Sequence, residues 1–269
     1  MANSGRRSAF AEERQRRITQ YVASRGRAHV AELTALVGVT EPTIRRDLSE
    51  LASQKRLKRV HGGAIAVEPL LEPEAASREL QYVAAKEAIA AACMQEIHQG
   101  SSLFLDSGST VLRVAQRLTG HHVDLLTNSI RVAEAVVGFP GVRHTVLGGQ
   151  LRRTSDCFVG PLALSALKQF TVNVAFIGAS GISAEGISDS DLGETQLKTA
   201  IIARARRVVV PIDHSKVGST HFALIAPLDH IDLVVTDQDN AELQAVCKEH
   251  GVEVRVAQAL DEHELRAAS

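Results

Sequence analysis

Apolar residues near the start of the chain recur with the spacing of an α-helix. Ile44, Leu48 and Leu51 lie four and then three residues apart, so they form one apolar stripe. Thr40 suits the N-cap of this helix, and Pro42 falls in its first turn, where a missing N–H costs nothing. The pattern predicts a helix after Thr40 whose outward face is polar and basic, made of Thr43, Arg45, Arg46 and Ser49.

A helix-turn-helix is predicted because a second helical pattern precedes this one. Residues 30–37 place Val30, Leu33 and Leu36 inward, and Gly38 then permits a tight left-handed turn. An earlier helix, over residues 12–24, is expected to pack behind the pair. Residues 54–67 alternate basic and apolar side chains on either side of two glycines, which indicates a two-stranded wing.

Beyond residue 78, short apolar runs alternate with helical patterns. The expected strands are 102–105, 123–126, 143–147, 172–177, 207–212, 231–235 and 252–256, and the expected helices are 86–97, 110–118, 130–137, 162–170, 195–204 and 240–249. This alternation predicts a Rossmann-like, three-layer α/β domain with a mostly parallel sheet. Because residues 68–77 hold two prolines among acidic residues, we expect domains at 1–67 and 78–269 with a linker between them.

The distribution of charge separates the two expected domains. Residues 1–67 carry 13 Lys and Arg against 6 Asp and Glu, a net charge of +7, whereas residues 68–269 carry 17 against 25, a net charge of −8. A basic domain can displace counterions from DNA phosphates, so we expect the first domain to bind double-stranded DNA. Thr40, Thr43, Arg45, Arg46 and Ser49 of the helix, with Lys55, Lys58, Arg59 and His61 of the wing, are the candidate contacts.

Small and hydrogen-bonding residues follow five of the expected strands. Ligands of open parallel sheets bind at the carboxyl ends of the strands, so these loops indicate a binding site, although each alone could be an ordinary turn. The candidates are Asp106, Ser107, Gly108, Ser109, Thr110, Thr127, Asn128, Gly148, Gly149, Ser180, Asp213 and Lys216, with Arg152 and Glu194 as further candidates. Neither GxxxxGK[ST] nor GxGxxG is present, so a small phosphorylated metabolite is favoured over a nucleotide.

Both halves of the chain resemble the DeoR/GlpR family of bacterial transcriptional regulators. In the first half the resemblance rests on TIRRDLSEL followed by LKRVHGGA, and in the second on LFLDSGST, LLTNS, LGG, FIGASGI and DHSK. The resemblance implies an effector domain similar in fold to ribose-5-phosphate isomerase A and glucosamine-6-phosphate deaminase. It also implies that the loop 106–110 holds a phosphate, that Thr127, Asn128, Gly148 and Gly149 line the pocket, and that Lys216 faces the phosphate or sugar.

No catalytic residue is expected. Ribose-5-phosphate isomerase has a DGADE segment after the strand that matches residues 172–177, whereas residues 178–182 read GASGI and lack both acids. Glu185, Asp189, Asp191 and Glu194 follow nearby and are interpreted as a solvated loop and helix N-terminus. The histidines show neither HxH nor HExxH spacing, and the three cysteines are isolated, so neither a metal site nor a cofactor is expected.

These observations favour a cytoplasmic, sugar-phosphate-responsive repressor of a carbohydrate or polyol operon. We expect a homodimer or homotetramer, because one winged helix makes few base contacts. We expect no membrane association, because no apolar run approaches the roughly 18 residues of a membrane span. Two alternatives stay open: an isomerase tethered to DNA, and an architectural DNA binder without an effector.

Overall fold

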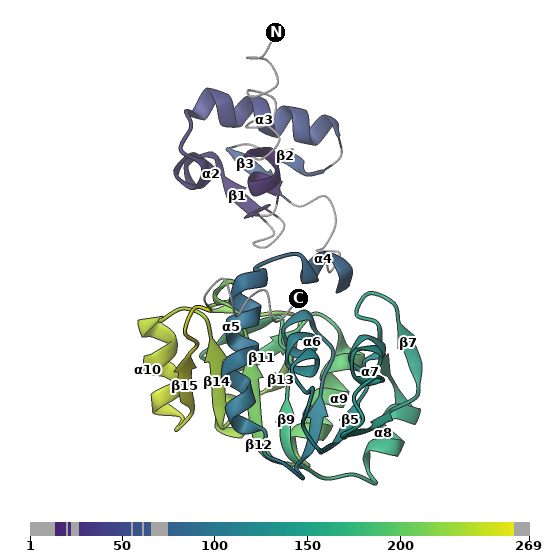
Figure 1. Cartoon of the computed structure of the whole chain (residues 1–269). Coiled ribbons are helices and arrows are strands. Elements are labelled where there is room, and N and C mark those ends of the chain that lie inside the picture. Colours follow the sequence, from purple (N-terminus) through teal and green to yellow (C-terminus); the bar gives the residue numbers. More distant parts are fainter. Residues whose placement is uncertain are drawn as a thin grey trace. The chain divides into compact units, whose positions relative to one another are not determined.

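The computed structural model describes residues 14–19, 21–22, 27–54, 56–60, 62–65 and 75–260. The chain divides into two compact units, residues 1–72 and 73–269, which are coloured along the sequence in Figure 1. Lys55, His61 and most of the predicted linker lie outside the described residues. The last three residues of that linker are instead helical, because the short helix α4 spans Ala75–Glu79.

The first unit contains the predicted helix-turn-helix and wing. Its chain is helical at residues 14–19 and 21–22 and continues through β1 (Arg27–His29), α2 (Val30–Val37), α3 (Glu41–Ser53), β2 (Lys58–Val60) and β3 (Gly63–Ile65). The strand β1 was not predicted. It pairs antiparallel with β3, which gives a three-stranded sheet in the order β1-β3-β2.

The predicted apolar stripe of α3 forms the core of this unit. Ile44, Leu48 and Leu51 are buried together with Ile18 and Leu33. Thr40 occupies the N-cap with an extended backbone, but its hydroxyl lies 3.1 Å from that of Thr43 and does not cap a backbone N–H. Gly38 has a φ of 67°, as the predicted left-handed turn requires.

A buried ion pair attaches α3 to the helical segment that precedes β1. Asp47 is 3% exposed and accepts hydrogen bonds from Arg14 Nε at 2.6 Å and Arg14 Nη2 at 3.0 Å. Asp47 therefore does not subtract from the charge on the outward face of α3. It fixes the orientation of that helix, because a charge buried without its partner would cost several kcal/mol, of order 3–5.

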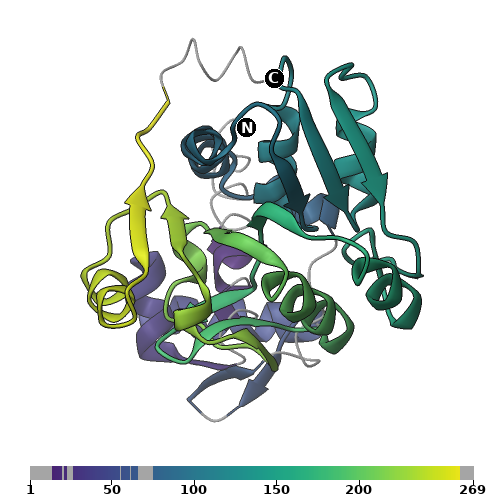
Figure 2. The same ribbon diagram turned by 90° about the horizontal axis from the view of Figure 1, so that it is seen from below.

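The second unit is built on a seven-stranded parallel sheet, as Figures 1 and 2 show. Its strands are β4 (Ser102–Leu105), β5 (Val123–Thr127), β6 (Val142–Val146), β9 (Val172–Phe176), β12 (Ala205–Pro211), β14 (Leu233–Thr236) and β15 (Glu253–Val256). Its helices are α4, α5 (Val83–Cys93), α6 (Ser109–Gln116), α7 (Ile130–Val136), α8 (Pro161–Leu167), α9 (Leu192–Ile202) and α10 (Ala241–Glu249), with the 3-10 turns η1 (Met94–Glu96), η2 (His214–Lys216) and η3 (Leu228–His230).

Two apolar cores cover the two faces of this sheet. In β12, Val208 and Val210 pack with residues of α8, α9 and α10, whereas Val209 between them packs with residues of α5, α6 and α7. This alternation is the two-residue period of a strand buried on both faces. It accounts for the near-continuous apolar runs in the sequence and confirms the predicted three-layer α/β fold.

The order of the strands creates one switch point in the sheet. The order is β15-β14-β12-β9-β4-β5-β6, so the chain runs outward from β4 to β6 and then returns to place β9 on the other side of β4. The loops that follow β4 and β9 consequently diverge at the carboxyl edge. In sheets of this type, that divergence opens a crevice between the two loops.

Several short antiparallel strands were missed by the sequence prediction. They are the hairpin of β7 (Gln150–Arg152) and β8 (Cys157–Val159), and the sheet of β10 (Gly181–Ser183), β11 (Gly186–Asp189) and β13 (Ala223–Ala226). Each strand has only three or four residues, too few for a periodic pattern to stand out. No helix within the described residues has the length and apolar character needed to span a membrane.

Candidate functional site

The outward face of α3 carries most of the predicted DNA contacts. Arg45, Arg46 and Ser49 are exposed and Thr43 is half-buried. Arg45 makes only an exposed ion pair with Glu41, at 3.3 Å, so its guanidinium can be released to another anion at little cost. This face can therefore offer two arginines to a phosphate backbone or a base edge.

The wing lies against the same face of α3. Arg59 of β2 donates a hydrogen bond of 2.7 Å from its Nη1 to Ser49 Oγ, and Ser49 in turn donates to the carbonyl of Arg45 at 2.8 Å. A hollow between helix and wing is lined by Arg45, Arg59, Val60 and Gly62. The exposed Lys58 belongs to the same strand, so helix and wing present one continuous basic surface.

A pocket opens at the switch point of the parallel sheet in the second unit. It encloses about 670 Å³, part of which is open solvent. Its walls come from the loops after β4, β9 and β12, from α9, and from the segment that joins α4 to α5. Of the residues predicted from the sequence, it brings together Ser107, Gly108, Ser109, Thr110, Ser180, Glu194, Asp213 and Lys216.

Six other predicted residues do not line this pocket, because of where their strands lie. Asp106 is fully buried beside the pocket wall. Thr127, Asn128, Gly148 and Gly149 follow β5 and β6, which lie on the far side of β4. Thr127 donates to the carbonyl of Leu105 at 2.6 Å and Asn128 to that of Phe158 at 3.3 Å, so both side chains bond to the backbone of neighbouring strands. Arg152, from the hairpin of β7 and β8, donates to Glu194, which lines the pocket.

Several pocket residues were not predicted from the sequence, and they lie on α4, α5, β11, α9 and the segment that joins α4 to α5. They are Arg78, Gln81, Tyr82, Lys86, Asp189 and Lys198. Burial lowers the pKa of Lys86 to about 8, opposed by the charge of Asp213 and assisted by those of Lys216 and Arg78. Three cationic side chains thus gather on one side of the pocket. In the sequence, Lys86 appears only as a charged residue beside Glu87 in an otherwise apolar segment, and no spacing rule connects it to a pocket.

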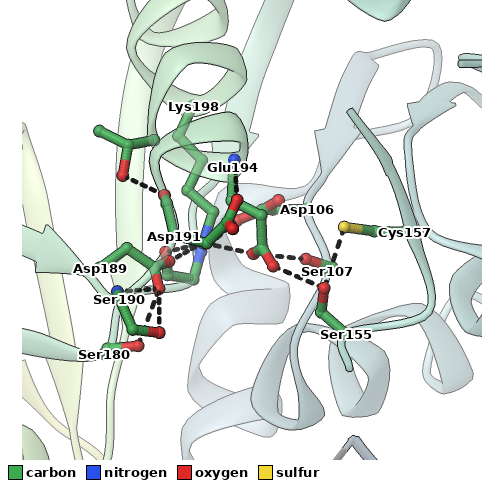
Figure 3. Close-up of polar contacts among 12 residues, drawn as sticks. Asp106, Ser107, Ser155, Cys157, Ser180, Asp189, Ser190, Asp191, Glu194 and Lys198 are labelled. Atoms are coloured by element: carbon green, nitrogen blue, oxygen red, sulfur yellow. Dashed lines mark hydrogen bonds and ion pairs between the residues drawn. The ribbon is translucent and has the colours of Figure 1, made fainter. Parts of the chain in front are cut away.

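Lys198 stands at the centre of a buried ionic cluster, drawn in Figure 3. Its ammonium lies 2.5 Å from Asp189 Oδ2, 3.3 Å from Asp106 Oδ2 and 3.3 Å from Glu194 Oε2, and it donates to the carbonyl of Gly178 at 3.0 Å. Asp189 and Glu194 were expected in a solvated loop and helix terminus. Glu194 does lie in the first turn of α9, but the expected solvent exposure is wrong, because both residues are 3% exposed.

The pKa values of two carboxyl groups in the cluster shift in opposite directions. Burial raises the pKa of Asp106 to about 6, although the charge of Lys198 works in the opposite direction. Burial also disfavours the charged form of Asp189, but attraction to Lys198 and hydrogen bonds from Lys198, Ser190 and Ser180 outweigh it and hold the pKa near 2. Burial lowers the pKa of Lys198, but the three carboxylates outweigh it and keep the pKa well above its usual value. The ammonium is therefore permanently charged.

Glu194 joins this cluster to the hairpin of β7 and β8. Its Oε1 accepts hydrogen bonds from Ser155 Oγ at 2.5 Å and from Arg152 Nη1 at 2.8 Å. Its Oε2 faces Lys198 and Ser107 (Figure 3). Asp191, the N-cap of α9, accepts from the backbone N–H of Glu194 and pairs with Arg152 at 3.1 Å. One carboxylate therefore touches the pocket, the ionic cluster and the hairpin.

Comparison with known proteins assigns both units to one family. Residues 14–69 match the DeoR-like helix-turn-helix domain, and residues 81–238 match the DeoR C terminal sensor domain. The chain belongs to the DeoR family of transcriptional regulators, as its motifs predicted.

The relatives of this chain include named repressors. It is 33% identical over 227 residues to the "Glycerol-3-phosphate regulon repressor" of Escherichia coli, covering 84% of this chain and 90% of that one. It is 31% identical over 251 residues to the "HTH-type transcriptional repressor GlcR" of Bacillus subtilis, covering 93% and 97%. Among solved structures, ribose 5-phosphate isomerase A from Methanocaldococcus jannaschii aligns over 49% of this chain and 53% of its own, with 17% identity and a TM-score of 0.36.

Removal of the Lys198 ammonium should destabilise the second unit. Lys198→Met leaves three buried carboxyl groups without their cation, so we expect the free energy of unfolding at pH 7 to fall by about 3–5 kcal/mol. Urea denaturation measures this change. The matched variant Lys168→Met, at an exposed position, should differ from the wild type by less than about 0.5 kcal/mol. Equal effects of the two substitutions would contradict the structural role of the cluster.

Proposed function

We propose that this protein is a transcriptional repressor of a carbohydrate or polyol catabolic operon, released from its operator by a phosphorylated sugar or polyol. Residues 1–67 form the DNA-binding part, and residues 78–269 bind the effector and form a homodimer or homotetramer. The repressor names of the relatives support the first statement. The chemistry of the pocket supports the second.

The gathering of cations around a hydroxyl-rich loop is the observation that carries the proposal. Lys86, Lys216 and Arg78 face the pocket together with Ser107 and the residues 108–110 that begin α6. Ammonium and guanidinium groups, hydroxyls and the unsatisfied N–H groups of a helix N-terminus are the partners that phosphate oxygens prefer. The basic side of the pocket fits one phosphate group.

The remaining walls fit a polyhydroxyl chain. Asp213, Ser180 and Glu194 also line the pocket, and carboxylate and hydroxyl oxygens accept hydrogen bonds from sugar hydroxyls. The base of a nucleotide, or a nicotinamide ring, would need an apolar or aromatic slot. Tyr82 is the one aromatic residue of the described lining.

Release of DNA requires that the effector favour one state of the protein. A ligand shifts an equilibrium only by its difference in affinity for the two states. We infer that the effector binds more tightly to the arrangement that cannot hold the operator. Two separate binding surfaces, one in each unit, must then respond differently to substitution.

Arg45→Ala and Lys216→Ala should separate the two activities. Loss of Arg45 removes a base or phosphate contact and should weaken operator binding by about 5- to 150-fold, corresponding to 1–3 kcal/mol, with effector binding unchanged. Lys216→Ala should weaken binding of the phosphate ester and leave operator binding intact. Fluorescence anisotropy of labelled operator and calorimetry of the ester measure the two affinities.

Two matched variants control for the change in charge. Arg27→Ala, at an exposed position of β1, should keep operator affinity close to that of the wild type, and Lys248→Ala on α10 should keep the affinity for the ester. The two-site division is contradicted if either Arg45→Ala or Lys216→Ala reduces both activities equally in a folded protein.

Affinity for the phosphate ester should depend on pH through Lys86. The pKa of Lys86 lies at about 8, so the ammonium that attracts an anion is present below that pH and is lost as the pH rises through it. We expect affinity to fall between pH 8 and 10 in the wild type by up to about tenfold per pH unit. Calorimetry across this range should find a weaker but nearly flat profile for Lys86→Met. A flat wild-type profile would exclude Lys86 from the binding of the phosphate.

A further inference from the structure

The helix α4 is the first described element of the second unit, and the turn of the β7 and β8 hairpin holds it. The backbone N–H of Ala75 donates to the carbonyl of Thr154 at 2.9 Å, and Arg78 Nη2 donates to the same oxygen at 3.5 Å. The carbonyl of Thr154 in the hairpin turn thus accepts one hydrogen bond from the backbone at the start of α4 and one from the Arg78 side chain in the last turn of α4.

Arg131 of α7 ties the same two elements together by charge. Its Nη2 lies 2.9 Å from Glu79 Oε1 of α4, and its Nη1 lies 3.6 Å from Asp156 Oδ2 of the hairpin turn. Asp156 has a φ of 49°, an uncommon conformation for a residue other than glycine, and its carbonyl accepts from the N–H of Ile130 at 2.9 Å. The turn is therefore fixed on α7, and Arg131 bridges from there to α4.

The opposite side of the hairpin reaches the pocket. Arg152, which ends β7, and Ser155, which lies within the turn, both donate to Glu194, and Glu194 lines the pocket. Arg78 also lines the pocket while it contacts Thr154. The contacts that hold α4 are thus connected to the pocket at two places, Glu194 and Arg78.

We propose that these contacts form a clasp through which an anion in the pocket changes the attachment of α4, and with it the chain that leads to the DNA-binding unit. The clasp consists of Ala75, Arg78, Glu79, Arg131, Thr154 and Asp156. This inference rests on the proposed function, because it takes the pocket to be an anion site. It adds the route by which a bound anion in the pocket affects α4 and the chain that precedes it.

Arg78 is the side chain that both the carbonyl of Thr154 and an anion in the pocket can contact. Its bond to Thr154 is long, at 3.5 Å, and joins a cation to a neutral carbonyl. A phosphate group offers a shorter and often bidentate contact in which both partners are charged, and this favours the guanidinium over a single long bond to a neutral carbonyl. An anion in the pocket therefore draws the guanidinium away from Thr154 and leaves α4 held by Ala75 and Arg131.

Amide hydrogen exchange of the full chain, with inorganic phosphate as the probe, tests the clasp. In the wild type, phosphate should slow exchange in the loop 106–111 and accelerate exchange in residues 75–82. In Arg131→Ala without phosphate, exchange in residues 75–82 should already be roughly threefold to tenfold faster, because two ion pairs are lost. Phosphate should accelerate exchange there further, because Arg78 keeps its contact with Thr154 in this variant, and it should still protect the loop 106–111.

Arg143→Ala is the matched control. Arg143 forms an exposed ion pair with Asp124 at 2.6 Å between β6 and β5, so the substitution removes the same charge outside the clasp. It should leave the exchange of residues 75–82 at the wild-type rate. Unchanged exchange in the main sheet of each variant shows that the fold is intact.

The outcomes separate the clasp from the proposed function. If phosphate protects the loop 106–111 but leaves residues 75–82 unchanged or slower, the pocket is an anion site and the clasp is wrong. The clasp is also wrong if Arg131→Ala affects residues 75–82 no more than Arg143→Ala does. If phosphate protects neither segment, the anion site itself fails and the clasp fails with it.

Discussion

The buried ammonium of Lys198 holds together the segments that meet at the switch point of the parallel sheet. Asp106 follows β4, Gly178 follows β9, Asp189 ends β11, and Glu194 lies one turn before Lys198 on α9. These elements are distant in sequence, and the lysine binds all of them within 3.3 Å. Because a buried cation without its carboxylates would be very costly, the elements are held in one arrangement. The pocket lies next to these elements.

The order of the strands explains why only some of the candidate loops meet. The loops after β4, β9 and β12 lie on adjacent strands at the switch point, and they form the pocket. The loops after β5 and β6 lie beyond β4, where Thr127 and Asn128 bond to the frame and to the hairpin of β7 and β8. The cations Arg78 and Lys86 come from the start of the unit. A ligand there would contact both the sheet and the segment that follows the DNA-binding part.

The sequence predicted the features that depend on local patterns. The stripe of Ile44, Leu48 and Leu51 located α3, and the apolar runs located all seven parallel strands. Strand order, however, depends on packing across the sheet, so the sequence could not exclude Thr127 or Gly148 from the pocket. The burial of Asp189 and Glu194 was missed for the same reason. Lys198, the cation that both carboxylates share, lies on a helix whose sequence pattern does not reveal these partners.

The central claim is that the pocket binds a phosphorylated sugar or polyol, and thermal unfolding tests it most directly. The purified protein would be heated with a panel of phosphorylated sugars and polyols and with their unphosphorylated parents. A ligand at 100 times its dissociation constant stabilises the folded protein by about 2.7 kcal/mol, which is a readable shift. We predict that one phosphate ester raises the midpoint and that its parent does not. If no ester in the panel shifts the transition, or if ester and parent act equally, the account of the pocket is contradicted and an effector-independent DNA binder is favoured.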